Sequence, residues 1–254
     1  TSDYFSVRCI ICQRAMIKKT LSLQKKKGET PLACMERFRA GNSEYEELPM
    51  TYAGRLDPIA TGELLVLVGD ECKKKEEYLG FDKEYEATVL VGFQTDSYDV
   101  LGLSKIGEVE PLRLDIEKQL LGMVGKFSQP YPPYSSKTVN GKQLHEHARA
   151  GEIDFIDIPT KEVEIYNIEN VTFEEISKED LLIEIKETIG LVKGAFRQDK
   201  IKKSWEEILN VYDISYTFKL VSFTVKVSSG AYIRSIANNL GGALLRLHRT
   251  KIFR

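Results

Sequence analysis

The stretch YAGRLDPIATG, which runs from Tyr52 to Gly62, places a single carboxylate, Asp57, between two glycines and directly before a proline. Gly54 permits a positive φ or the close approach of another backbone. Pro58 fixes its own φ and keeps Asp57 out of the helical region. An apolar run, residues 63–68, follows at once. We therefore expect a stiff loop that leads into a buried strand and presents a carboxylate, although Asp before Pro is also ordinary turn chemistry.

Length and composition suit a single domain over residues 1–254 with internal insertions. Apolar residues make up 42% of the chain and charged residues 29%, which is typical of a protein with a real core and a charged surface. No apolar run approaches the ~18 residues of a membrane-spanning helix, so no membrane partner is expected. No signal peptide is recognisable. The chain starts with Thr1 rather than Met, so we expect a processed, trimmed or partial N-terminus.

Charge is nearly balanced, with 36 Lys and Arg against 38 Asp and Glu, so bulk charge does not indicate a nucleic-acid partner. Basic residues nevertheless gather in four clusters, each of which could be a phosphate-binding face or a solvated helix face. The clusters are Arg14 with Lys18, Lys19 and Lys25 to Lys27; Lys73 to Lys75; Lys193, Arg197, Lys200, Lys202 and Lys203; and Arg246, Arg249, Lys251 and Arg254.

The four cysteines, Cys9, Cys12, Cys34 and Cys72, show no disulfide framework, which favours a reducing, cytoplasmic location. Cys9-x-x-Cys12 could be half of a zinc site. A second pair at matching spacing is missing, and the nearest histidine is His145. We therefore expect no metal and no cofactor.

Apolar periodicity predicts most of the regular elements. Alternation from Tyr85 to Phe93 predicts a strand over residues 83–93. Thr30 is a good N-cap and Pro31 a good first helical residue, so a helix should begin there and end near Gly41. The other expected elements are strands over 64–68, 162–171, 181–188 and 216–227; helices over 71–79, 111–122 and 237–247; a polar turn over 174–180; and a loop leading into a basic helix within 190–212.

Several segments, in chain order, resemble motifs of the TruB-type pseudouridine synthases. The Asp57 stretch resembles the Gly-x-Leu-Asp-Pro-x-Ala-x-Gly loop of that family. Residues 25–31 are similar to its Lys-Pro-x-Gly-x-Thr/Ser loop, with Lys26 in place of the proline. Residues 83–85 resemble its Lys-x-Tyr motif, and residues 92–102 its Gly-x-x-Thr-Asp-x-x-Asp-x-x-Gly loop.

Three further segments complete the resemblance. Residues 127–151, rich in proline and aromatic side chains, resemble the segment that forms a thumb over the RNA. Residues 228–235 resemble a Ser-x-Gly-Thr-Tyr-Ile-Arg-Thr motif, with Ala231 in place of the threonine, and residues 247–250 a closing Leu-x-Arg-Thr segment. Residues 190–212 have no counterpart in shorter members of the family, so they are interpreted as an insertion.

The resemblance implies roles for four residues. Asp57 would be the catalytic carboxylate and Arg234 would pair with it. Tyr85 would pack against the aspartate and the target base, and Leu247 would line the base pocket. Without the resemblance, Tyr85 is an ordinary core aromatic and Arg234 a surface arginine at a helix start.

RNA contacts are expected mainly from the thumb-like insertion at about residues 127–160. A stiff, basic and aromatic loop suits an RNA loop, since it offers stacking and phosphate contacts; the alternative is a proline-stiffened connector. Lys25, Lys137 and Lys142 are predicted contacts. Tyr52 is another, because it stands where many family members have a histidine that supports neighbouring bases. His145 and His147 are interpreted as surface or RNA-contacting residues.

The resemblance implies an α+β, pseudouridine-synthase-like fold with a mixed, mainly antiparallel sheet flanked by helices and a thumb insertion. It implies a single catalytic domain without the C-terminal RNA-binding domain of many members, because residue 254 follows the closing motif so closely. The expected function is a monomeric, cytoplasmic tRNA pseudouridine synthase acting on the T-arm uridine, position 55 of tRNA. The alternatives are a non-catalytic RNA-binding or tRNA-folding protein and a carboxylate hydrolase, which lacks a convincing second carboxylate.

Overall fold

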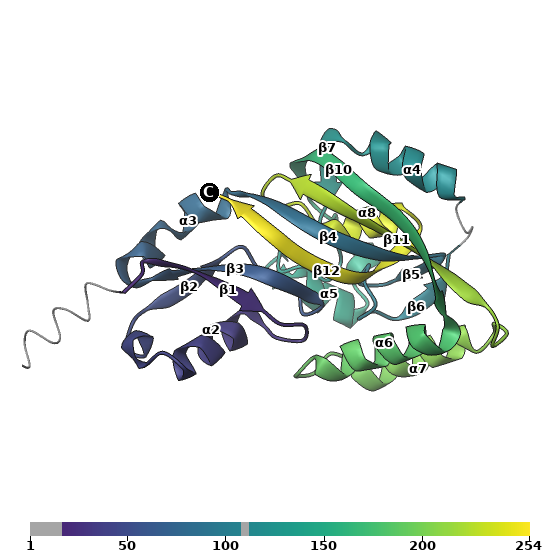
Figure 1. The fold of residues 1–254 in the computed structure, drawn as a ribbon, viewed down its shortest axis with the longest axis horizontal. Coiled ribbons are helices and arrows are strands. Elements are labelled where there is room, and N and C mark those ends of the chain that lie inside the picture. The colour runs from purple at the N-terminus through teal and green to yellow at the C-terminus, as the bar shows by residue number, and fades with distance from the viewer. Residues whose placement is uncertain (1–16, 108–111) are drawn as a thin grey trace, which may run out of the picture.

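The computed structural model describes residues 17–107 and 112–254 (Figure 1). Three residues singled out in the sequence, Cys9, Cys12 and Arg14, lie outside this described part of the chain. Within it, no helix is both long and apolar enough to cross a membrane.

One continuous eight-stranded sheet runs through the described chain, and almost all of its neighbours are antiparallel. The parallel pair is β3 with β12. The prediction of an α+β fold with a mixed, mainly antiparallel sheet is thus confirmed (Figure 1). In spatial order the strands are β1 (Thr20–Lys25), β3 (Ala60–Val68), β12 (Gly242–Phe253), β4 (Asp82–Val91), β11 (Thr217–Val227), β10 (Thr160–Ser177) and β7 (Gly125–Pro130), with β2 (Met50–Ala53) beside β3.

Strand β3 changes partners along one edge, and this change positions the Asp57 loop. At its start β3 pairs with β12, where Ala60 lies opposite Leu247. Further along, the same edge pairs with β2, where Leu65 lies opposite Ala53. Residues 54–59 connect the end of β2 to the start of β3. The loop therefore lies where β2 gives way to β12, beside a central strand of the sheet.

Helices cover both faces of the sheet (Figure 1). On one face, α4 (Arg113–Gly122) and α8 (Ile233–Asn239) bury apolar residues against β4, β10 and β11. On the other face, α6 (Lys178–Leu191) and α7 (Gln198–Leu209) pack on β4, β11 and β12. The helix α2 (Pro31–Ala40) packs on β1 and β3, and it begins as predicted, with the Thr30 hydroxyl accepting from the Ala33 N–H at 3.0 Å.

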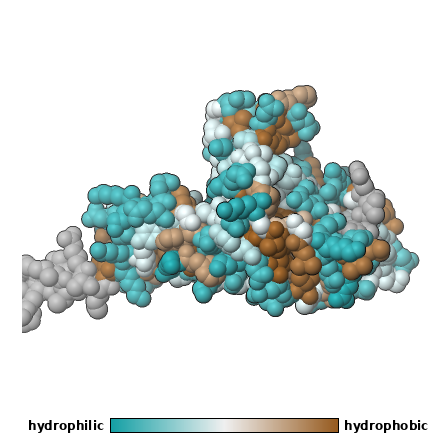
Figure 2. All heavy atoms as spheres, turned by 90° about the horizontal axis from the view of Figure 1, so that it is seen from above, coloured by the Kyte–Doolittle hydropathy of each residue, from teal (hydrophilic) through white to brown (hydrophobic). Residues whose placement is uncertain are grey.

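Between β7 and β10 the chain leaves the sheet as residues 131–159, here called the thumb segment. It carries a small hairpin and the helix α5 (Leu144–Ala150), whose N-terminus has a capping box of Gln143 and Glu146. Seen from above, the body bears a tall projection, and apolar side chains gather on both (Figure 2).

The short elements are η1 (Ser43–Tyr45), η2 (Gly69–Lys74), α3 (Lys75–Leu79), β5 (Phe93–Thr95), β6 (Ser104–Ile106), β8 (Thr138–Val139), β9 (Lys142–Gln143), α5 (Leu144–Ala150) and η3 (Ile153–Phe155).

The expected turn over 174–180 and strand over 181–188 are wrong. Strand β10 continues to Ser177, and α6 follows directly. The Ser177 hydroxyl caps this helix by accepting from the Asp180 N–H at 3.1 Å. Leu181, Ile185 and Ile189 are buried at a spacing of four residues, which is a helical period that overrides the short-range alternation.

The expected helix over 237–247 is also wrong. Helix α8 ends at Asn239, and Gly241 then takes a positive φ of 70°. A Cβ on Gly242 would lie 2.4 Å from a methyl of Val89, so only glycine lets β12 approach β4 this closely. Leu244 and Leu245, consecutive in sequence, are both fully buried because the two faces of this central strand are covered. An apolar run of that kind does not distinguish a strand from a helix.

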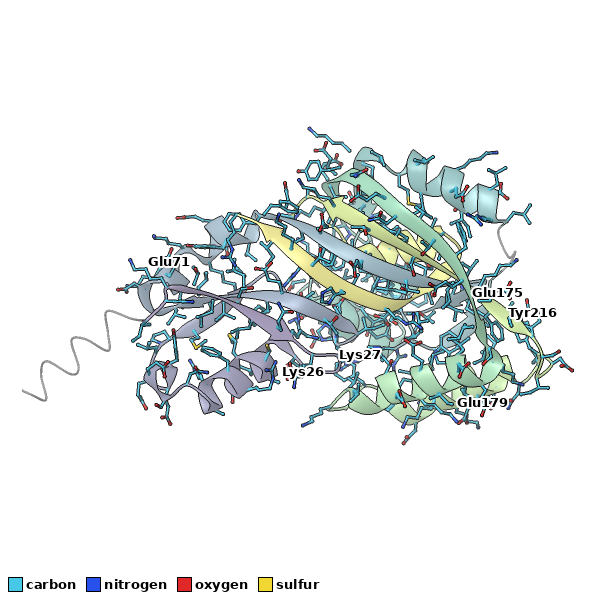
Figure 3. The ribbon with its side chains drawn as sticks, in the orientation of Figure 1. Lys26, Lys27, Glu71, Glu175, Glu179 and Tyr216 are labelled. Carbon is cyan, nitrogen blue, oxygen red and sulfur yellow. The ribbon has the colours of Figure 1, made fainter. Side chains whose placement is uncertain are left out.

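The α6–α7 pair packs against the loop after β1. Gly28 has a φ of 81°, and a Cβ there would lie 2.5 Å from the Leu191 carbonyl oxygen at the end of α6. Lys26 and Lys27 lie on this loop, between α2 and the helical pair (Figure 3), and Lys27 is 3.9 Å from Glu184 of α6. The Gly28 N–H also donates to the Pro58 carbonyl at 2.8 Å, so the end of α6 lies close to the Asp57 loop.

Candidate active site

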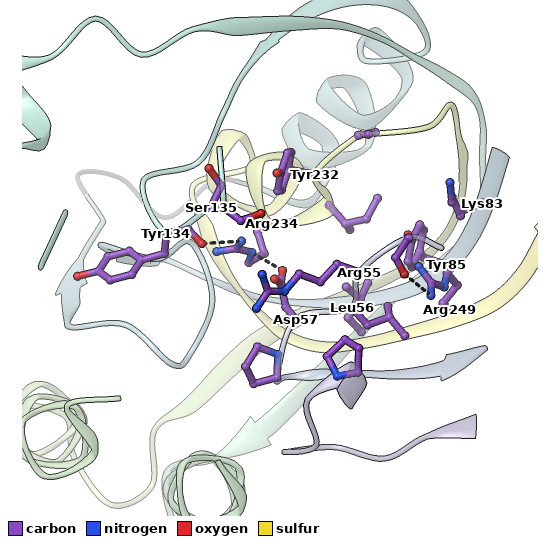
Figure 4. Close-up of a pocket in the computed structure, with 18 of the residues that line it drawn as sticks. Arg55, Leu56, Asp57, Lys83, Tyr85, Tyr134, Ser135, Tyr232, Arg234 and Arg249 are labelled. Carbon is purple, nitrogen blue, oxygen red and sulfur yellow. Dashed lines mark hydrogen bonds and ion pairs between the residues drawn. The ribbon is translucent and has the colours of Figure 1, made fainter. Parts of the chain in front are cut away.

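A cavity of about 450 Å³ opens between the Asp57 loop, the start of α8 and the thumb segment (Figure 4). Asp57, Tyr85, Arg234 and Leu247 all line it, although they are far apart in the sequence. The structure thus brings together the four residues to which the sequence assigned roles in chemistry and base binding.

Asp57 and Arg234 form an ion pair at the centre of the cavity (Figure 4). The Asp57 Oδ2 atom lies 2.8 Å from Arg234 Nε, although this N–H makes no hydrogen bond of good geometry. The Asp57 side chain is 31% exposed, whereas that of Arg234 is 4% exposed. The carboxylate therefore faces the cavity, and the guanidinium lies behind it.

A second carboxylate, that of Asp99, lies on the buried side of the guanidinium, 3.8 Å from Arg234 Nε. Arg234 also donates to the carbonyl oxygens of Ser97, at 2.8 Å, and Tyr134, at 3.3 Å. Asp99 accepts from the Ser97 hydroxyl at 2.7 Å and from the Leu101 N–H at 3.0 Å. The sequence indicated a structured turn at 92–102 but no role for Asp99, because its approach to Arg234 depends on tertiary packing.

Burial and charge act in opposite directions on this network. Burial raises the pKa of Asp99 to about 6, even though Arg234 and the hydrogen bond from Ser97 favour its ionised form. Burial by itself would lower the pKa of Arg234, but the Asp57 and Asp99 carboxylates outweigh it and hold that pKa above its usual range. Arg234 consequently stays cationic beside Asp57.

Two buried cations support the Asp57 loop through its backbone. Arg249, which is 1% exposed, donates from Nη2 to the Gly54 carbonyl at 3.1 Å and from Nε to the Glu63 carbonyl at 2.7 Å. Lys25, which is 2% exposed, donates to the Ala60 carbonyl. Burial lowers the pKa of Lys25 to about 8, although Asp57 raises it in part. Lys25 was predicted to contact RNA, but its ammonium faces the Lys26, Pro58 and Ala60 carbonyls rather than solvent.

Apolar side chains form the wall beside the carboxylate. Tyr85, on β4, is 8% exposed, and Leu247, on β12, is 7% exposed. Both belong to the core cluster of the α8 side of the sheet, together with Leu56 of the Asp57 loop. A ring or an aliphatic edge beside one charged oxygen suits a flat, mostly uncharged ligand.

Two tyrosines at the cavity were not predicted as site residues. Tyr232 lies just before α8 and is held through its backbone, since its N–H donates to the Gln129 side chain at 2.8 Å. Tyr134 offers its carbonyl to Arg234, while its ring points away and its hydroxyl donates to Asp96 at 3.1 Å (Figure 4). Burial, together with Asp96, raises the pKa of Tyr134 to about 12.

The predicted RNA contacts outside the cavity have separate surroundings. Tyr52 is half-buried in β2, packs on the α2 side of β3 and has the Lys75 ammonium 5.4 Å from its ring. Lys137 is exposed and lies 5.4 Å from the Tyr131 ring. Lys142 is exposed and lies 3.5 Å from Glu152.

The interpretation of His147 as a surface residue is wrong. This side chain is 5% exposed, and its two nitrogens contact the Glu152 carboxylate at 2.8 Å and the Val139 carbonyl at 3.1 Å. His147 thus fastens α5 to the hairpin β8–β9 within the thumb segment. His145 lines the cavity instead. Among the described residues, no three His, Cys, Asp or Glu side chains gather as a metal site would require.

Comparison with known proteins places this geometry in context. A family model described as the N-terminal domain of the TruB family of pseudouridylate synthases matches residues 45–195. A tRNA pseudouridine synthase B of Lactiplantibacillus plantarum is 25% identical over 232 residues, covering 90% of this chain and 62% of that protein. A tRNA pseudouridine synthase B of a Nostoc species is 35% identical over 159 residues, covering 61% of this chain and 52% of that protein. The chain thus spans between half and two thirds of the length of these two relatives.

Among solved structures, a crystal structure of a Cbf5–Nop10–Gar1 complex contains a chain that superposes with a TM-score of 0.52 at 16% identity. The alignment covers 92% of this chain and 48% of that chain. At this identity the likeness concerns the fold alone.

Proposed function

Because the chain belongs to the TruB family of pseudouridylate synthases, we propose that it isomerises a uridine of tRNA to pseudouridine, with Asp57 as the catalytic carboxylate. The observation that carries this proposal is the Asp57–Arg234 ion pair, which holds one half-exposed carboxylate in a cavity walled by Tyr85 and Leu247. The relatives named tRNA pseudouridine synthase B support tRNA as the substrate, and we propose the T-arm uridine, position 55, as the target.

The proposed reaction breaks the bond between uracil N1 and the sugar, turns the ring and forms a bond from C5 to the same sugar carbon. The C5 proton leaves to solvent and N1 gains a proton, so atoms and electrons balance without an oxidant, a metal or a cofactor. A single carboxylate suffices, either as a nucleophile or as the base that takes a sugar proton. The uridine first leaves its stack, at a cost of roughly a few kcal/mol.

In this proposal the residues around Asp57 have separate roles. Tyr85 stacks on the extruded base, and Leu247 closes the opposite edge of the pocket. Arg234 orients Asp57 and balances its charge, as a charge-assisted pair in a secluded site does. The exposed Lys137 and Lys142 of the thumb segment, together with Tyr52, contact RNA outside the pocket.

The proposed molecule is a single catalytic domain that acts as a monomer in the cytoplasm. The continuous sheet supports a single catalytic domain, because all four pocket residues lie on it or on loops and helices packed against it. The thumb segment carries exposed basic side chains, and one of them, Arg149, lines the cavity together with Tyr134 and His145. A single RNA stem–loop could therefore meet both surfaces.

Tritium release from tRNA labelled at uridine C5, followed by mapping of pseudouridine in the product, tests the proposal. Wild-type protein should release tritium and modify one T-arm position. Asp57→Asn should abolish release and retain tRNA binding. Asp115→Asn, an exposed aspartate on α4 away from the cavity, is the matched control and should be fully active.

The rival interpretation is a protein of the same fold that binds or folds tRNA without modifying it. The intact Asp57–Arg234 pair argues against it, because a binding protein has no need to hold a buried arginine behind a half-exposed carboxylate. Tight binding of tRNA by the wild type, with no tritium released, would decide for the rival.

A further inference from the structure

The connection between α6 and α7, residues 192–197, reaches the mouth of the Asp57 cavity. Phe196 lines the cavity there, as do His145 and Arg149 of the thumb segment. The family match ends at residue 195, immediately before this phenylalanine. The connection between α6 and α7 thus supplies an aromatic side chain to the proposed active site.

The backbone of this connection is held in one conformation by Gln198. The Gln198 side chain donates to the Val192 carbonyl at 3.1 Å and to the Gly194 carbonyl at 2.6 Å, and it accepts from the Phe196 N–H at 3.0 Å. Gly194 has a φ of 93°, which glycine adopts freely. The position of Phe196 is therefore set in large part by the connection itself and by packing of its ring against the core cluster on the α6–α7 side of the sheet.

Arg197 anchors the same connection to the body. Its φ of 60° is uncommon for an arginine, and such a conformation persists where surrounding contacts hold it. Arg197 donates from Nη1 to Asp96 at 2.8 Å, and its guanidinium lies 4.7 Å from the Tyr134 ring centre. Arg197 and Tyr134 share Asp96 and so join the connection to the thumb segment. The Phe196 ring is left half-exposed at the opening.

Arg149 of α5 faces the same opening. It is exposed, its guanidinium lies 5.7 Å from the Phe196 ring centre, and within the described part of the chain it forms no ion pair. An aromatic face beside an arginine without an acidic partner matches what proteins use for unpaired nucleotides, where the ring stacks on a base and the cation meets a phosphate.

We propose that Phe196 and Arg149 form a second nucleotide subsite, which holds one further unpaired nucleotide of the substrate loop while the target uridine occupies the Asp57 cavity. Phe196 stacks on the base and Arg149 contacts the adjacent phosphate. This inference rests on the proposed function for the identity of the RNA, but the subsite acts in binding and needs no turnover.

The test is a binding cycle in an Asp57→Asn background, so that no modification occurs. The probe is a synthetic T-arm stem–loop RNA and a series in which each unpaired loop nucleotide except the target is replaced, one at a time, by an abasic residue. Phe196→Ala should weaken binding of the intact stem–loop about 10-fold, the usual scale for one stacked base. For one abasic RNA of the series, Phe196→Ala should cause no further loss of affinity, because that RNA already lacks the base that stacks on Phe196.

Further variants separate stacking from packing. Phe196→Leu keeps an apolar side chain at the opening without an aromatic face, so it should lose affinity as Phe196→Ala does. Phe196→Trp should retain affinity. Arg149→Ala should make the negative slope of log affinity against log salt shallower by roughly 0.7–0.9, as expected for one lost phosphate contact. Tyr166→Ala, at an exposed tyrosine of β10 that does not line the cavity, should bind every RNA like the wild type.

The subsite would be overturned if Phe196→Ala weakened the binding of every abasic RNA equally, or if Phe196→Leu bound RNA with full affinity. Either result would mean that Phe196 acts by packing within the protein and not by stacking on a base. The outcome is independent of catalysis. Coupling to one base together with no tritium release by the wild type would uphold the subsite and reject the enzyme. Normal tritium release by the wild type, with no coupling between Phe196 and any one base, would uphold the enzyme and reject the subsite.

Discussion

At the scale of single residues, the site depends on one arginine placed between two carboxylates. Arg234 contacts Asp57 at 2.8 Å on the cavity side and lies 3.8 Å from Asp99 on the buried side. Its guanidinium therefore balances the carboxylate of Asp57, which faces the cavity, and the carboxylate of Asp99, which is buried. Removal of one partner of a buried pair is strongly destabilising because the other charge is left uncompensated.

We predict that Arg234→Ala abolishes tritium release and lowers the free energy of unfolding by roughly 3–5 kcal/mol. Chemical denaturation measures the second effect. Lys203→Ala is the control, since Lys203 is exposed and pairs with Glu207 across one turn of α7 at 3.6 Å; its cost should stay below about 0.5 kcal/mol. A stability change in Arg234→Ala as small as in the control would contradict the buried-charge explanation.

The buried Asp99 predicts a pH dependence of stability. Its folded-state pKa is about 6, above the ordinary value of 3.8 that applies in the unfolded chain. Between these values the folded protein binds more protons than the unfolded chain, so the stability that Asp99 contributes falls as the pH rises. The contribution is fully present below pH ~4, is lost as the pH rises through ~6 and is constant above, with a total change of roughly 3 kcal/mol.

Denaturant unfolding of the wild type and of Asp99→Asn between pH 4 and pH 7 checks this prediction. The free energy of unfolding of the wild type minus that of the variant should decrease across the interval and then level off. A difference that increases with pH would mean that the Arg234 guanidinium outweighs burial at Asp99.

At the scale of elements, the α6–α7 pair both covers one face of the sheet and carries a segment to the cavity. Trp205 of α7 is fully buried, and its ring N–H donates to the Val100 carbonyl at 3.1 Å. This bond ties α7 to residues 92–102, which also hold Asp99. Packing on the far side of the sheet is thereby connected to the surroundings of Arg234.

The start of α6 offers a test at this scale. Ser177→Ala removes the cap on the Asp180 N–H and should lower the free energy of unfolding by about 1 kcal/mol. Thermal or chemical unfolding measures it, with Ser43→Ala, an exposed serine of η1, as the control that should show no change. No loss in Ser177→Ala would indicate that α6 is held by packing alone.

At the scale of the whole molecule, the sheet brings a loop after β2, the start of β4, the start of α8 and a central strand to one opening. The formal net charge is −2, so RNA must be held by local basic groups rather than by overall attraction. Lys137 is such a group on the thumb segment, exposed and without an acidic partner in the described chain. Binding that rests on local contacts of this kind weakens steeply with salt.

We predict that tRNA affinity falls linearly on a plot of log affinity against log salt, and that Lys137→Ala makes this negative slope shallower by roughly 0.7–0.9. Fluorescence anisotropy over a range of KCl concentrations gives the slope. Lys118→Ala, an exposed lysine on α4 that does not line the cavity, should leave it unchanged. Equal slopes for wild type and Lys137→Ala would remove Lys137 from the RNA interface.

The amino-acid sequence alone determined features that depend on near neighbours in the chain. The Gly54–Pro58 restraints predicted a loop that presents Asp57, and the structure has a loop at residues 54–59. Thr30 and Pro31 predicted the start of α2, because capping is local chemistry. Alternation from Tyr85 predicted the strand β4, because side chains on a strand repeat every second residue.

Only the tertiary structure decided features that depend on residues distant in the chain. The apolar run after Gly241 became the central strand β12 because β3 and β4 flank it, and Lys25 was buried because the Pro58 and Ala60 carbonyls meet its ammonium. Asp99 reached Arg234, and Phe196 reached the cavity, through helix and sheet packing. Burial on both faces erases the periodicity that separates strand from helix, and no short-range pattern encodes a contact between side chains more than a hundred residues apart.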